Sequence, residues 1–182
     1  MFTPAVFDAC RSIEPSGRGE LEITDAIQAL IDRGARVEPH VVTGWWKDTG
    51  KWEDMIEANR LVLDTIERRI EGELRDSTVE GRVAIGPGTV LERTHVRGPV
   101  AIGAGARLRD SFVGPYSAVG DGCELDHAEI EHSILLENAK VLHLEGRIEG
   151  SLIGRNVVIG RSELKPRAYR FLVGDNAQIG VL

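Results

Sequence analysis

The chain has 182 residues, which is enough for one large domain or two small ones, and its 42% hydrophobic content can supply a core. Its formal net charge of −7 argues against the broad basic surface that nucleic-acid or membrane-surface binding requires. Cys10 and Cys123 lie far apart and outside any C-x-x-C pair, no apolar run is long enough to span a bilayer, and the amino terminus lacks the regions of a signal peptide. The cysteine spacing gives no support for zinc or dithiol redox chemistry. These features together predict a cytoplasmic protein that has neither nucleic acid nor a membrane as a partner.

The first part of the chain predicts helices around one strand. A short helix is expected over residues 4–12. A second helix is expected to begin at Thr24 as N-cap and to stop at Gly34. Residues 35–43, ARVEPHVVT, are rich in valine and predict a strand, which would lie at an edge or bulge because Pro39 cannot donate to a ladder.

The heptapeptide GWWKDTG places two of the three tryptophans beside one carboxylate, Asp48, and between two glycines. Two interpretations follow from the residues alone. Asp48 could bind a metal ion with the tryptophans as apolar walls, or it could cap the next helix with the tryptophans in the core. That helix has the longest helical pattern of the chain, over residues 53–71, with Thr49 or Gly50 as its cap and Gly72 at its end.

The helical period disappears from about Val79, where Ile-Gly and Val-Gly pairs begin to recur. Many of these pairs lie six residues from another pair or from a leucine. Six is a multiple of the strand period of two, so residues at this spacing can all point to the inside of a coil. This spacing predicts a parallel β-helix of hexapeptides over residues 79–182, with an irregular part over 135–151; a sandwich fits less well because its turns recur at 8–12 residues. The eight pairs begin at Ile85, Ile102, Val113, Val119, Ile153, Ile159, Val173 and Ile179.

Two strings, PSGRGELEITDAIQ and GWWKDTGKWEDMIEANRLVLD, are followed by these hexapeptides. Together they resemble the C-terminal half of the long form of glucose-1-phosphate thymidylyltransferase, a sugar nucleotidyltransferase with a β-helix tail. The resemblance implies an α/β remnant of a Rossmann-like nucleotidyltransferase domain over residues 1–72, a linker over 73–78, and a left-handed parallel β-helix over 79–182.

The resemblance also implies a reaction, in which deoxythymidine triphosphate and glucose 1-phosphate give dTDP-glucose and pyrophosphate. Enzymes of this family hold Mg²⁺ with two aspartates, and the second of these matches Asp48. Trp46, Thr49 and Gly50 stand in register with the same motif and are candidate substrate-binding residues. Two more candidates lie upstream, where Arg18 could neutralise a phosphate and Glu20 could bind sugar hydroxyls; the alternative is that both belong to a surface turn.

The chain departs from the family pattern in its phosphate-binding parts. The 182 residues contain no G-x-G-T-R-x-x-P loop and no E-K-P segment, and the first metal-binding aspartate that the resemblance implies is missing as well. The resemblance therefore implies an incomplete and inactive fragment that binds Mg²⁺ only weakly by itself. A separate N-terminal catalytic half would be its partner, and nucleotide and sugar phosphate would bind only to the complete enzyme.

Two alternatives of other classes remain open. Hexapeptide acyltransferases use a histidine of the β-helix as general base, and His95, His127, His132 and His143 are candidates that the sequence does not distinguish. The chain could also be a non-catalytic assembly module. Because the ends and flat faces of a β-helix need cover, we expect a homo-oligomer, with a trimer as the first expectation.

Overall fold

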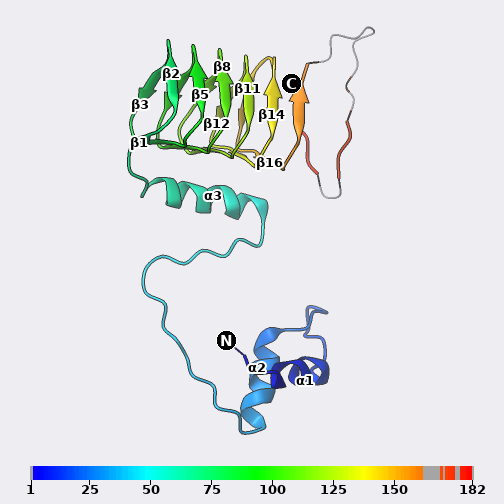
Figure 1. Ribbon diagram of the computed structural model, residues 1–182. Helices are drawn as coiled ribbons and strands as arrows, with labels where there is room; N and C mark the ends of the chain where they lie inside the picture. Colours follow the sequence, from blue (N-terminus) through cyan, green and yellow to red (C-terminus); the bar gives the residue numbers. More distant parts are fainter. Residues whose placement is uncertain (1, 162–168, 170, 175–176, 182) are drawn as a thin grey trace. The chain divides into compact units, whose positions relative to one another are not determined.

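The computed structural model describes residues 2–161, 169, 171–174 and 177–181. The chain divides into two compact units, Met1–Trp46 and Lys47–Leu182 (Figure 1). No helix among the described residues is both long and apolar enough to cross a bilayer. Each unit has its own hydrophobic cluster, so each is described separately.

The first unit is a pair of helices, α1 (Ala5–Ser12) and α2 (Ile23–Asp32). Ala9 of α1 and Ala26 of α2 are fully buried, and their small side chains allow the two helices to pack closely. Gly34 ends α2 as predicted, with a positive φ of 79° and its amide bonded to the carbonyl of Ile31. The predicted cap is wrong, because α2 begins at Ile23 after Glu22 and no side chain caps it.

The predicted strand over residues 35–43 does not form. These residues have no regular structure, and Val37, Val41 and Val42 are exposed. A strand of this length needs a neighbour to satisfy its backbone groups, and no strand of the described chain pairs with it. High valine content alone was therefore a poor guide here.

The second unit begins with α3 (Trp52–Leu63), which buries Ile56 and Leu63. The helix is shorter than the predicted range of 53–71, because Arg69–Ile70 forms the first strand, β1. Ile70 pairs in register with Ile85 of the next coil, so packing into the β-helix overrides the helical pattern. Gly72 serves this packing too, since a Cβ there would lie 2.7 Å from the carbonyl oxygen of Thr89.

Three parallel sheets, named A, B and C, form the β-helix (Figure 1). Sheet A contains β1, β4 (Val83–Ile85), β7 (Val100–Ile102), β10 (Ser117–Val119), β13 (Ile134–Leu135) and β16 (Leu152–Ile153). Sheet B contains β2 (Glu73–Arg75), β5 (Val90–Glu92), β8 (Arg107–Arg109), β11 (Glu124–Asp126), β14 (Lys140–Leu142) and β17 (Val158–Gly160). Sheet C contains β3 (Thr78–Glu80), β6 (His95–Arg97), β9 (Phe112–Val113), β12 (Glu129–Glu131) and β15 (Arg147–Glu149).

The parallel β-helix predicted by the hexapeptides is confirmed, and its coils are consistent with the left-handed winding expected. One aliphatic residue from each sheet fills the interior of each coil, as Ile85, Leu91 and Val96 do, and Ile102 begins the next coil. The steps between them are six, five and six residues, so successive coils are 17 residues apart here rather than 18. The uniform period of six was therefore correct for two of the three faces.

The short step crosses the corner between sheets B and C, which we call the B–C corner. One residue there adopts the left-handed region in each coil, and a single such residue turns the chain in little space. None of the five is glycine, which explains why the sequence pattern did not reveal this corner. They are Asp76, Arg93, Asp110, His127 and His143, with φ between 46° and 51°.

The β-helix departs from the predicted range at both ends. Its strands begin at Arg69, before Val79, and the last described strand ends at Gly160. Val173 and Ile179 lie in described residues without a strand and are exposed, so the hexapeptide prediction is wrong there. Within 135–151 the expected irregularity is limited to a wider step of seven residues between Val141 and Ile148, because β14 and β15 continue the stack.

Candidate functional site

Asp48 lies in the irregular, exposed segment of the second unit that leads into α3. Its carboxylate makes no hydrogen bond or ion pair with any residue that the structure describes. Gly50 leaves space beside it, since a Cβ at Gly50 would lie 3.7 Å from the Asp48 Oδ1 atom. The carboxylate is therefore presented to solvent, where it could accept a cation.

The first turn of α3 is capped by a different carboxylate. The Lys51 backbone amide donates to the Asp54 Oδ2 atom at 3.3 Å, and the Lys47 ammonium lies 2.9 Å from the Asp54 Oδ1 atom. The hydrogen bond from Lys47 lowers the pKa of Asp54. The interpretation of Asp48 as the helix cap is therefore wrong, and so is the predicted cap at Thr49 or Gly50.

The tryptophans around Asp48 are not buried in either unit. Trp45 is 59% exposed and Trp46 is 76% exposed, while Trp52 begins α3 and is also exposed. The interpretation that places the tryptophans in the core is thus wrong for this chain, and their role as apolar walls of a metal site stays a prediction. Binding of substrate by Trp46, Thr49 and Gly50 stays a prediction; all three are exposed.

Arg18 and Glu20 lie in a turn of the first unit. The Ser16 amide donates to the Glu20 carbonyl at 2.8 Å, which closes the turn through the Glu20 backbone and leaves its side chain exposed. The Arg18 guanidinium instead pairs with Glu22 at 2.6 Å, and this hydrogen bond lowers the pKa of Glu22. A phosphate at Arg18 would have to compete with Glu22, a residue that the sequence analysis did not single out.

Contacts with the β-helix hold α3 in place within the second unit. The Asn59 amide donates to the Tyr116 carbonyl oxygen at 3.0 Å, and the Arg60 guanidinium lies 6.0 Å from the centroid of the Tyr116 ring. Asp64, at the end of the helix, forms an ion pair of 3.0 Å with Arg82 of the β-helix. The segment bearing Asp48 thus leads directly into an anchored helix. The one sequence signal for this contact is Asn59, a polar residue that stands among the apolar positions of the helical pattern.

The four histidines of the β-helix lie at different places. His95 packs edge-on against Phe112, and His132 packs against Tyr116. His127 and His143 face each other at the B–C corner, with ring centroids 5.0 Å apart. The Nδ1 atom of His127 lies 2.6 Å from Oδ1 of Asp126, whereas the Nε2 atoms of His143 and His95 lie 3.7 Å from their nearest carboxylate oxygens.

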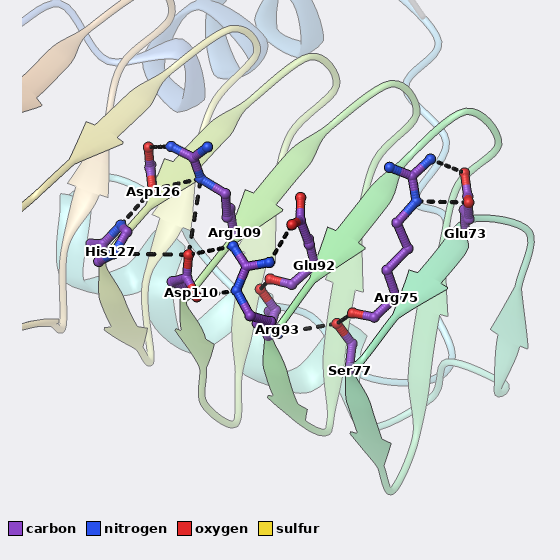
Figure 2. A network of polar contacts seen from close by, with 10 residues as sticks. Glu73, Arg75, Ser77, Glu92, Arg93, Arg109, Asp110, Asp126 and His127 are labelled. Carbon is purple, nitrogen blue, oxygen red and sulfur yellow. Dashed lines mark hydrogen bonds and ion pairs between the residues drawn. The ribbon is translucent and has the colours of Figure 1, made fainter.

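Figure 2 shows the charged network that runs along sheet B and the B–C corner. Arg93 pairs with Asp110 at 2.7 Å, and Arg109 pairs with Asp126. The hydrogen bond from Arg109 is the main reason that the pKa of Asp126 falls to about 2. Among the described residues, the metal-ligating side chains that gather in a group of three are Asp126, His127 and His143, and Asp48 is not one of them.

Comparisons with known proteins agree with the motifs. The family model "Nucleotidyl transferase" matches residues 1–65. Glucose-1-phosphate thymidylyltransferase of Streptomyces antibioticus is 49% identical over 181 residues, which cover 99% of this chain and 51% of that protein. The protein of the same name from Streptomyces griseus is 44% identical over 179 residues, covering 98% of this chain and 50% of its own length.

A third relative comes from an archaeon. Low-salt glycan biosynthesis nucleotidyltransferase Agl11 of Haloferax volcanii is 44% identical over 183 residues, which cover 98% of this chain and 51% of that protein. The chain therefore spans about half the length of the relatives it matches. The resemblance inferred from the two sequence strings and the hexapeptides is confirmed.

Proposed function

We propose that this chain, which is homologous to the glucose-1-phosphate thymidylyltransferases over nearly its whole length, contributes to the synthesis of a sugar nucleotide. Deoxythymidine triphosphate and glucose 1-phosphate are the expected substrates, and dTDP-glucose and pyrophosphate the expected products. The observation that carries the proposal is the 49% identity to a protein of that name across 99% of the chain. The free thiols Cys10 and Cys123 support a reducing compartment, and we propose the cytoplasm.

The role proposed for Asp48 is to supply one carboxylate ligand to Mg²⁺. This ion takes few carboxylates and completes its shell with phosphate oxygens and water, and Asp48 is exposed enough for such an arrangement. Lys47 does not neutralise Asp48, because its ammonium is bound to Asp54. When bound, the metal would neutralise charge that develops on the pyrophosphate leaving group.

The helix after Asp48 would position this carboxylate. The Asn59 side chain and the Asp64–Arg82 ion pair fix α3 to the β-helix, so the loop is attached to an ordered element at that end. A ligand held by an ordered element loses less conformational freedom when the metal binds. The β-helix would in this way support the metal-binding segment in addition to any role in assembly.

The test is a chimera with the Streptomyces antibioticus relative. The 182 residues replace the matching half of that protein, and pyrophosphate release is followed with glucose 1-phosphate, deoxythymidine triphosphate and Mg²⁺. We expect turnover from the chimera and a loss of roughly a hundredfold or more from its Asp48→Asn variant. The chain by itself is expected to give no turnover above background, because its 182 residues contain no G-x-G-T-R loop.

A second chimera controls for the junction. It carries the matching half of the Streptomyces griseus relative, which shows whether that position tolerates exchange. The proposal would be overturned by a folded but inactive chimera beside an active control, or by an Asp48→Asn chimera that retains full activity. Circular dichroism establishes that each protein is folded.

A further inference from the structure

The B–C corner brings two histidines of successive coils together. His127 follows β11 and His143 follows β14, and these strands pair in parallel with Asp126 opposite Leu142. Each histidine adopts the left-handed region at the same place in its coil, with φ of 49° and 51°. Their rings therefore lie side by side with centroids 5.0 Å apart and an angle of 36° between the ring planes, and both side chains remain more than half exposed.

Asp126 lies against both rings. Its Oδ1 atom is 2.6 Å from Nδ1 of His127, and its Oδ2 atom is 3.7 Å from Nε2 of His143. One ligand atom from each of the three residues lies within 4.8 Å of the others. Two ligands of one tetrahedral zinc ion lie roughly 3.4 Å apart, given metal–ligand bonds of about 2.0–2.2 Å. Small rotations of exposed rings would bring the three atoms to that spacing.

The carboxylate is already oriented and charged. Asp126 is 8% exposed, and both its oxygens accept hydrogen bonds from the Arg109 guanidinium. Arg109 brings a positive charge that opposes a cation, and Arg93 brings a second. Three carboxylates, those of Glu92, Asp110 and Asp126, are bonded to these two guanidiniums, so the network has one negative charge in excess.

We propose that Asp126, His127 and His143 form a binding site for a divalent cation of the zinc type at the B–C corner. Two imidazoles and one carboxylate are donors that suit Zn²⁺, Co²⁺ or Ni²⁺, whereas Mg²⁺ prefers oxygen ligands alone. The exposed side of the rings leaves a fourth position for water. The bound ion would join two successive coils through their side chains. The site is separate from the one proposed at Asp48 and does not depend on the proposed function.

The test is a titration of the untagged chain with Zn²⁺ by calorimetry, together with the visible absorption of bound Co²⁺. We expect one ion per chain with a spectrum of nitrogen and oxygen ligation, and a melting temperature that rises with Zn²⁺. His127→Asn and His143→Asn should each weaken binding at least tenfold and abolish the thermal shift. Asparagine is the matched replacement because it tolerates the left-handed region better than most residues.

His132→Asn is the control. This residue also has φ of 49° but lies beside Tyr116, so its replacement causes the same backbone change and should leave Zn²⁺ affinity unaltered. If an asparagine variant does not fold, glutamine at the same position takes its place. Equal affinity in the native chain and in the His127→Asn/His143→Asn double variant would overturn the proposal and would assign any binding to Cys10 or to other residues. Failure of the native chain to bind Zn²⁺ would overturn it as well.

Discussion

Truncation of one interior leucine should show how the β-helix is stabilised. Leu74, Leu91, Leu108 and Leu125 stand in register along the inside of sheet B. Leu108 is 1% exposed between two fully buried leucines, whereas Leu74 lies in the terminal coil and is 39% exposed. Leu108→Ala and Leu74→Ala therefore make the same chemical change at equivalent positions of two coils.

The expected losses differ because only one site leaves an enclosed cavity. Removing three carbons from the buried Leu108 costs roughly 2.4 kcal/mol in transfer free energy. A residual cavity raises the loss to roughly 3 kcal/mol or more, because neighbouring coils on both sides hold the backbone in place. At Leu74 less area is buried and solvent reaches the site, so we expect about 1 kcal/mol.

The measurement is the free energy of unfolding in urea, followed by far-UV circular dichroism for the native chain and both variants. Equal losses at the two positions, or a loss below about 1 kcal/mol at Leu108, would refute the reasoning. Such a result would mean that the interior collapses around the missing atoms, or that the coils unfold independently of one another.

Three further predictions concern charge, the anchored helix and assembly. Arg109 holds the pKa of Asp126 at about 2, below its usual value, so the ion pair should stabilise the fold by roughly 2 kcal/mol above about pH 4 and lose this effect as the pH falls toward 2. The difference in the free energy of unfolding between the native chain and Asp126→Asn, measured with a chelator present, should therefore shrink between about pH 4 and pH 2. Asn59→Ala should lower the free energy of unfolding by about 1 kcal/mol by leaving the Tyr116 carbonyl without its donor, and Gln28→Ala on exposed α2 should not. Light scattering should give about 60 kDa for a trimer of the 19.9 kDa chain, and a monomer alone at micromolar concentration would contradict that assembly.

Much of the second unit could be predicted because its interior positions repeat in the sequence. The spacing of Ile85, Leu91 and Ile102 reports directly which side chains point inward. The B–C corner was missed because residues as different as Arg93 and His127 adopt the same left-handed conformation there. That conformation is imposed by the stacked coils and not by local preference.

Other features depended on contacts that a single sequence does not reveal. The end of α3 was predicted too late, because Ile70 fits a helical pattern as well as it fits the register of sheet A. For the candidate site, Asp48 could be predicted from its motif, whereas the Lys47–Asp54 ion pair beside the helix cap could not. The pairing of Asp126 with two histidines from different coils follows from register alone, and no motif signals it.

The 17-residue repeat also restricts how the length of this protein can change in evolution. Insertion of one residue within a strand would turn the side chains that follow it there to the opposite face, whereas a corner can absorb such a change, because Val119 pairs with Leu135 16 residues later and Leu135 pairs with Ile153 18 residues later. Duplication of a whole coil would preserve the match of Val83 to Val100 and of each pair like it, and would add one layer of about 4.8 Å. Relatives of different length should therefore differ by whole coils, with smaller changes confined to corners such as the one between Val141 and Ile148.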